Sequence, residues 1–275
     1  MSETTQFDQL YNERFSGKWE FERTTDGILT VRFKQPDSSR RDAEGYSIPS
    51  HNANPLTTVP GLQASSPVWS QIGNDPENKV VILTGYDGVF YNSHEHHFRQ
   101  GYWDATVWHS VIYNLPRAVM AFLDLPTLSL GAAIGEATVH AEFLLLCDIV
   151  VAGESAVFQD KPHFKQNTVP GDGVNVFWPL FLGWNRGRDF LLTGRKIDAY
   201  EALELGLVRE VVPDDQVLPR CHELARELLE QDELTLRYTA PALRQQLKVQ
   251  VLQYMQASLG LEGIVFMDQS SKRAR

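Results

Sequence analysis

A short apolar run, KVVILTG at Lys79–Gly85, constrains the fold of this chain most strongly. It is rich in β-branched residues, lacks polar alternation and ends at a glycine, which is typical of a strand buried on both faces. Similar strands are predicted at Thr127–Ile134, Asp148–Ala152 and Leu207–Val212. Helical patterns, with apolar residues three and four positions apart, separate these runs. The alternation predicts an α/β fold with a largely parallel sheet and helices outside it.

The remaining elements follow from local patterns. Trp19–Phe33 alternates in a two-residue period around Asp26-Gly27, which predicts a β-hairpin with a tight turn. Helices are predicted at Trp103–Leu123, Glu142–Cys147, Gly173–Leu182, Asp198–Leu205 and Gln216–Glu230, with Asp198 as an N-cap. From about Glu233 onward the pattern is helical only, with apolar positions too regular for a solvated tail.

Three regions are therefore expected. Residues 1–18 form an N-terminal extension, residues 19–212 form the core, and residues 213–275 form a helical end of the kind that often covers another subunit. Within the core, residues 34–67 are rich in Pro, Ser, Asn and Gly and predict a long irregular loop.

Composition excludes several classes of protein. The 275 residues, 43% of them hydrophobic, suffice for a sizeable buried core. A net charge of −10 disfavours nucleic acid as a partner, because phosphate binding needs a basic face and the basic cluster is confined to Lys272–Arg275. No apolar run is long enough to span a bilayer, so no membrane partner is expected. Two cysteines and the absence of a signal-peptide pattern indicate a reducing, cytoplasmic setting.

The stretch FQDKPHFKQNTVPGDG, Phe158–Gly173, carries the strongest chemical signal. His163 and Asp172 stand nine residues apart across a proline-glycine turn. A histidine oriented by a carboxylate is the general-base unit of many hydrolases. The alternative is structural, with Asp172 capping the helix that begins at Gly173 and His163 holding the loop by a hydrogen bond.

Several segments, taken in order, resemble the crotonase (enoyl-CoA hydratase/isomerase) superfamily. They are DPENKVVILTG at Asp75–Gly85, CDIVVA at Cys147–Ala152, AVFQ at Ala156–Gln159, VPGDG at Val169–Gly173, LTGRKIDAYEALELGLVREVV at Leu192–Val212, and the helical ending. The resemblance covers roughly residues 19–31 and 75–268. It implies a spiral of ββα turns with two roughly perpendicular sheets, followed by C-terminal helices, and assembly as a homotrimer or a dimer of trimers.

Two departures from that family concern the oxyanion hole. Members that act on acyl-CoA place a glycine triplet where this chain has Thr138-Val139-His140, and Ala-Gly where it has Asn92-Ser93. Side chains then stand where backbone must approach a thioester, so acyl-CoA binding through paired amides is not expected.

The histidines at the altered positions are similar to those of the carbon–carbon bond hydrolase branch, which includes 6-oxocamphor hydrolase and the cyanobacterial β-diketone hydrolases. That resemblance implies retro-Claisen cleavage of a cyclic β-diketone by water, giving a keto acid without cofactor or metal. It carries catalytic roles to His163, Asp172, His140 and Glu262, and to His51 on the irregular loop, which Tyr46 precedes by five residues.

The chemistry assigns a role to each residue. A neutral His163 with a pKa near 6.5 would take a proton from water, and Asp172 would orient its ring. His140 would donate a hydrogen bond to the second carbonyl, and Glu262 would place a water or relay a proton. Asn92, Glu95, Tyr46, Phe177 and Trp178 are the candidate substrate contacts.

Alternatives remain for individual residues and for the function. His140 can be a satisfied core histidine, Glu262 part of a salt bridge and His51 a solvated loop residue. His94-Glu95-His96-His97 has metal-binding residue types but not the spacing of a tetrahedral zinc site. Glu142 stands where hydratases have a second glutamate, which keeps an acyl-CoA hydratase, isomerase or thioester hydrolase open. A non-catalytic homologue acting in assembly or binding is the third possibility.

Overall fold

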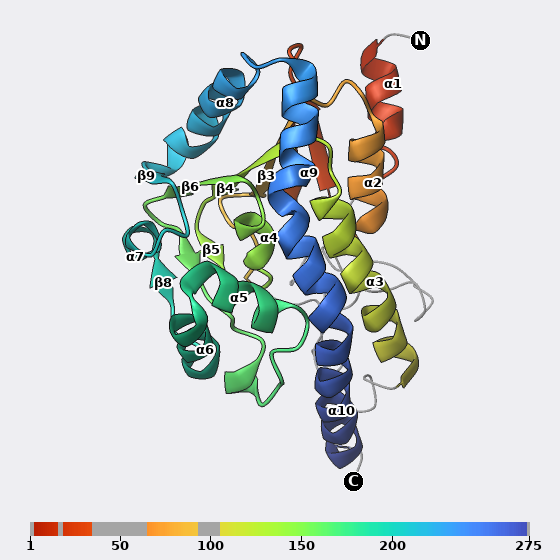
Figure 1. Ribbon diagram of the computed structural model, residues 1–275, viewed down its shortest axis with the longest axis vertical. Coiled ribbons are helices and arrows are strands. Elements are labelled where there is room, and N and C mark those ends of the chain that lie inside the picture. Colours follow the sequence, from red (N-terminus) through yellow and green to blue (C-terminus); the bar gives the residue numbers. More distant parts are fainter. Residues whose placement is uncertain (1–2, 16–18, 35–64, 93–104, 274–275) are drawn as a thin grey trace.

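The computed structural model describes residues 3–15, 19–34, 65–92 and 105–273 (Figure 1). Its main sheet has six strands in the order β1-β2-β3-β4-β6-β9. These are β1 (Trp19–Arg23), β2 (Ile28–Phe33), β3 (Val80–Gly85), β4 (Leu128–Ala133), β6 (Ile149–Gly153) and β9 (Glu210–Val212). The first pair is antiparallel and every later pair is parallel. The predicted hairpin and parallel sheet are both confirmed.

A second, smaller sheet has the order β5-β7-β8, from β5 (Glu136–Ala137), β7 (Val157–Phe158) and β8 (Ile197–Asp198). Its strands are too short to have been predicted from an alternating pattern. Gly135 joins β4 to β5 with a positive φ of 59°, and a β-carbon there would lie 2.2 Å from the carbonyl oxygen of Gly88. A glycine is therefore required where the chain leaves the main sheet for the second one.

Helices occupy most of the connections. They are α1 (Glu3–Leu10), α2 (Ser66–Asn74), α3 (Ala105–Leu123), α4 (Glu142–Leu145), α5 (Val174–Leu182), α6 (Trp184–Thr193), α7 (Ala199–Glu204) and α8 (Val217–Leu228). Asp198 caps α7 as predicted, because its carboxylate accepts a 2.8 Å hydrogen bond from the Glu201 amide. Helices α1, α2 and α6 were not predicted from the sequence. The N-terminal region is packed onto the core through Tyr11, which is fully buried and donates to Asp75 at 2.8 Å.

From Glu233 onward the helical end is one long rod beside α3 (Figure 1). Helix α9 (Glu233–Gln250) continues through a π-helical turn (Val251–Met255) into α10 (Gln256–Arg273). Large apolar side chains exposed on it include Leu234, Tyr238, Leu243, Leu252, Leu261 and Ile264. They are available for the predicted trimer, which stays a prediction. Among the described residues, no helix is both long enough and apolar enough to cross a bilayer.

Candidate active site

The loop between β7 and α5 brings His163 and Asp172 together. The Nε2 atom of His163 lies 3.3 Å from Oδ2 of Asp172, and both side chains are buried. Helix α5 begins after Gly173, whose φ of 112° suits glycine alone, and no side chain caps it. Gly173 rather than Asp172 is therefore the N-cap residue of α5, so the alternative that Asp172 is the N-cap is wrong.

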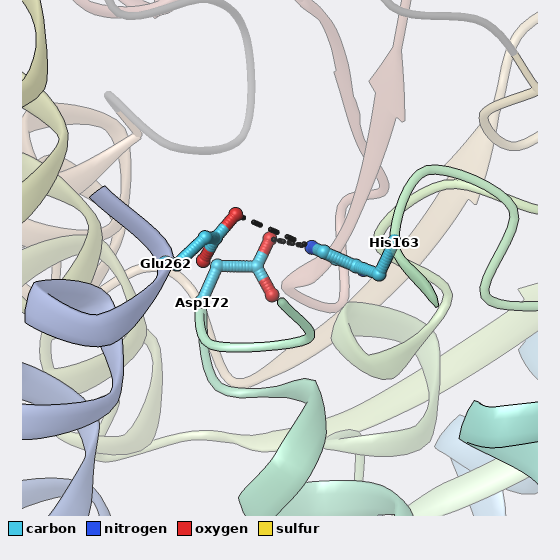
Figure 2. A group of neighbouring side chains, drawn as sticks. All are labelled: His163, Asp172 and Glu262. Carbon is cyan, nitrogen blue, oxygen red and sulfur yellow. Dashed lines mark ion pairs between the residues drawn. The ribbon is translucent and has the colours of Figure 1, made fainter. Parts of the chain in front are cut away.

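Glu262 reaches the same imidazole from α10. Its Oε1 atom lies 3.5 Å from His163 Nε2, so two carboxylates converge on one ring nitrogen (Figure 2). The approach depends on Gly171, where a β-carbon would lie 2.4 Å from the Ser258 carbonyl oxygen and 2.8 Å from the Glu262 β-carbon. Asn175 of α5 also donates to the Ser258 hydroxyl at 2.8 Å, which fastens the turn to the helix.

Asp160 is a site residue that the sequence reasoning missed. Its Oδ1 accepts a hydrogen bond of 2.5 Å from Nδ1 of His163, and its side chain is buried. Asp160 thus orients the imidazole from the Nδ1 side, the role that was predicted for Asp172, whereas Asp172 and Glu262 approach Nε2. An aspartate three residues before a candidate catalytic histidine was the available signal, since both lie in the quoted stretch.

His140 forms a second imidazole–carboxylate pair in the turn between β5 and α4. Its φ of 48° is left-handed, a conformation rare for residues other than glycine. Its Nδ1 atom lies 2.8 Å from Oε1 of Glu142 and 3.7 Å from Oδ2 of Asp172. The Asp172 carboxylate consequently lies between two histidines. The Glu142 carboxylate is engaged by His140, which the hydratase alternative did not foresee.

Burial and charge shift the pKa values throughout this cluster. Burial lowers the pKa of His163, but the carboxylates of Asp160 and Asp172 outweigh it and hold that pKa well above 6.5. Burial also lowers the pKa of His140, but the carboxylates of Glu142 and Asp172 outweigh burial, so the pKa of His140 is raised as well. Burial, and then the charge of Asp172, raise the pKa of Glu262 from 4.5 to about 7. The expectation of an unperturbed His163 pKa near 6.5 is therefore corrected: the neighbouring carboxylates raise that pKa and favour the imidazolium.

The other predicted residues lie elsewhere or are not described. His51, Tyr46 and Glu95 lie outside the described residues, as does the rest of the His94–His97 stretch. Asn92 donates to Oε2 of Glu136 at 2.9 Å. Phe177 and Trp178 are buried in α5, and the Trp178 ring packs against Phe190 at 4.1 Å between centroids. The contacts of Trp178 are those of helix packing. The roles of the five candidate substrate contacts, Tyr46, Asn92, Glu95, Phe177 and Trp178, stay predictions.

Two surface hollows lie away from this cluster. One, of about 250 Å³, is bounded by residues such as Arg32, Tyr86 and Ile134, and one of about 400 Å³ by residues such as Cys147, Phe181 and Leu207. Among the described residues, neither is lined by a histidine. The chemistry therefore concentrates at the buried cluster of His140, Glu142, Asp160, His163, Asp172 and Glu262, called here the acid–imidazole cluster.

Known proteins match this chain over most of its length. The family model described as enoyl-CoA hydratase/isomerase matches residues 51–274. A solved structure of a β-diketone hydrolase from the cyanobacterium Anabaena, bound to (S)-3-oxocyclohexyl acetic acid, is 34% identical, with a TM-score of 0.80, 94% of this chain covered and 97% of that one. A solved enoyl-CoA hydratase/isomerase from Mycobacterium paratuberculosis, 23% identical with a TM-score of 0.74 and coverage of 94% and 97%, shares the fold.

Curated relatives are more distant or match in part. The probable mitochondrial enoyl-CoA hydratase of Dictyostelium discoideum is 33% identical over 37% of this chain, and the match spans only 36% of that relative. The 4-chlorobenzoyl coenzyme A dehalogenase-1 of Arthrobacter is 28% identical over 74% of this chain and 70% of its own length. By its family model and its structural likeness together, the chain belongs to the enoyl-CoA hydratase/isomerase family and has the crotonase fold.

Proposed function

We propose that this protein hydrolyses a carbon–carbon bond of cyclic β-diketones in a retro-Claisen reaction, giving keto acids. The observation that carries the proposal is the convergence of Asp172 and Glu262 on Nε2 of His163, with Asp160 holding Nδ1. The likeness to the Anabaena β-diketone hydrolase supports the same chemistry. The acid bound to that protein is a keto acid, which is the product class of such a cleavage.

The first step activates water. Once His163 has lost its proton to solvent, its Nε2 lone pair accepts a proton from a water molecule, whose oxygen attacks one carbonyl carbon of the dione. Asp160 keeps the remaining proton on Nδ1, and Asp172 stabilises the imidazolium that forms. The product of this step is a tetrahedral oxyanion, with no covalent bond to the protein.

The second step breaks the bond. The oxyanion re-forms a carbonyl, the bond to the central carbon breaks, and its electron pair passes to the second ketone as an enolate. A protonated His140, held on Nδ1 by Glu142, carries its other N–H on Nε2 and can donate to that developing oxygen. A proton from the His163 imidazolium, or from Glu262 with its pKa of about 7, then completes the ketone.

The acyl-CoA alternatives meet an obstacle in the backbone. The middle residue of the altered glycine triplet, Val139, donates its amide to the Tyr91 carbonyl at 3.0 Å, and Thr138 donates to the same oxygen at 2.8 Å. An oxyanion hole needs such amides to point at substrate. This observation, with Glu142 engaged by His140, favours the diketone hydrolase over a hydratase, isomerase or thioester hydrolase.

The test is a substrate screen read by acid release and by loss of ultraviolet absorbance. Monocyclic 1,3-diketones and bicyclo[2.2.2]octane-2,6-dione, whose cleavage at one bond yields 3-oxocyclohexyl acetic acid, are compared with crotonyl-CoA. We expect the wild-type protein to turn over at least one dione, and we expect His163→Ala to lose that activity. Turnover of crotonyl-CoA with inert diones would replace the proposal by the hydratase alternative. A well-folded protein inert toward both would favour the non-catalytic homologue.

A further inference from the structure

Three donor atoms in the acid–imidazole cluster lie close enough together to share one metal ion. One nitrogen of His163 and one oxygen each of Asp172 and Glu262 all lie within 4.8 Å of one another. His163 Nε2 is 3.3 Å from the Asp172 oxygen and 3.5 Å from the Glu262 oxygen. Ligands about 2.0–2.2 Å from a tetrahedral zinc ion stand roughly 3.3–3.5 Å apart. Figure 2 shows both carboxylates directed at the ring nitrogen.

The far side of the imidazole is arranged as it is in zinc sites. A metal-binding histidine donates its other N–H to a carboxylate or carbonyl, which fixes the tautomer and makes the coordinating nitrogen more basic. Asp160 accepts that hydrogen bond on Nδ1 at 2.5 Å. The lone pair of the tautomer so fixed lies on Nε2, where Asp172 and Glu262 converge.

Two carboxylate oxygens of the cluster are buried and unpartnered within the described part of the chain. Oε2 of Glu262 and Oδ2 of Asp160 have no hydrogen-bond partner among the residues that the structure describes. The cluster also combines the carboxyl groups of Glu142, Asp160, Asp172 and Glu262 with only two imidazoles. Buried carboxylates without partners are costly unless paired or bound to a metal.

We propose that His163, Asp172 and Glu262 bind one zinc ion, and that the bound ion inhibits the protein's hydrolase activity. Binding displaces the Nε2 proton of His163 to solvent, and the nitrogen lone pair then forms the bond to zinc. The same lone pair accepts the proton of water in the proposed reaction, so the two uses exclude each other. Inhibition rests on the proposed function; zinc binding does not.

The experiment is a calorimetric titration of chelator-treated, full-length protein with zinc chloride, in parallel with dione hydrolysis. One ion per chain is expected, and hydrolysis is expected to fall in proportion to occupancy and return with chelator. Glu262→Gln is expected to weaken zinc binding at least tenfold, and Asp160→Asn by about 10–100-fold. The matched control Glu204→Gln, on the exposed face of α7, keeps wild-type affinity.

The possible results distinguish zinc binding at this site from inhibition by the bound ion. Wild-type zinc affinity in Glu262→Gln, or affinity lost only in His96→Ala/His97→Ala, would overturn the site. Stoichiometric binding that leaves dione hydrolysis unchanged, or accelerates it, would overturn the inhibition. If no dione is turned over, calorimetry still decides the binding claim, and the failure belongs to the proposed function.

Discussion

Two buried ionic groups in this protein are built differently. One joins Arg244 of α9 to Asp148, next to β6, and the other is the acid–imidazole cluster. The Arg244 guanidinium donates to Asp148, to the carbonyls of Leu125 and Thr127 and to the Ser129 hydroxyl, the last three at 3.0, 3.0 and 2.9 Å. The positive charge of Arg244 is therefore paired with one negative charge and several hydrogen-bond acceptors. In the acid–imidazole cluster, acids outnumber imidazoles, and two carboxylate oxygens lack partners among the described residues.

The difference indicates what each group does. A buried ion pair with its hydrogen bonds satisfied holds elements together, here fixing α9 to the ends of β4 and β6, and loses stability when one partner is removed. A buried cluster with raised pKa values and unpartnered oxygens sacrifices stability and is a marker of function. Substitutions should therefore separate the two groups, one through stability and the other through activity.

The largest expected effect is on catalysis. His163→Ala and Asp172→Asn should each lower dione hydrolysis by about 10³–10⁴-fold, because they remove the proton acceptor or the carboxylate that stabilises its charged form. Their melting temperatures should stay within a few degrees of wild type. Steady-state kinetics and thermal unfolding of the same preparations check both statements. Wild-type-like turnover in either variant would refute the mechanism.

The next effect is on stability, at the other group. Arg244→Met should lower the free energy of unfolding by about 3–5 kcal/mol, because Asp148 and two carbonyls lose a buried partner. Urea denaturation measures the change. In Arg244→Met/Asp148→Leu much of the loss should return, since no unpaired charge remains. A single variant as stable as wild type would contradict the structural role of this pair.

The sequence predicted the parts of the fold whose pattern is regular. β3 is buried along nearly its whole length, so its apolar run had a single interpretation. Helix α6 was missed because half of WNRGRDFLLT is polar and the segment contains Gly187, where a β-carbon would lie 2.4 Å from Pro179. That glycine serves the packing of α6 against α5, which a helix pattern does not reveal.

Prediction of the site likewise succeeded where a sequence pattern was present and failed where a contact depends on how the chain folds. The proximity of His163 to Asp172 was confirmed, and Glu262 and His140 lie in the same cluster. Asp160 was missed because its contact with Nδ1 depends on how the loop between β7 and α5 folds back, not on a spacing rule. His140 has a left-handed backbone conformation, which only coordinates reveal.

A smaller effect is expected on the pH dependence of hydrolysis. Asp160→Asn should move the acid limb of the rate profile to lower pH, because Asp160 is the leading carboxylate that raises the pKa of His163. The facing groups Asp172, Glu262, His140 and Glu142 remain, so the limb should persist. The maximal rate should fall about 10–100-fold as the ring loses its orientation. A limb shifted to higher pH, in kcat/KM measured from pH 5 to 10, would contradict this assignment.

The smallest effect concerns the stability cost of Glu262. Because its pKa is raised from 4.5 to about 7 in the folded protein, the folded state binds more protons than the unfolded one between those values, and stability falls as pH rises through them. Glu262→Gln removes this loss. The free energy of unfolding of the variant should match that of wild type near pH 5 and exceed it by about 1–2 kcal/mol near pH 9. Each pKa unit corresponds to about 1.4 kcal/mol, and the lost contact with His163 offsets part of the gain. Denaturation at both pH values measures the difference, with Glu204→Gln as the exposed control. If Glu262→Gln and wild type lose stability in parallel as pH rises, ionisation of the buried Glu262 carboxyl does not destabilise the fold. The acid–imidazole cluster would then differ from the Arg244–Asp148 pair only through its effect on activity.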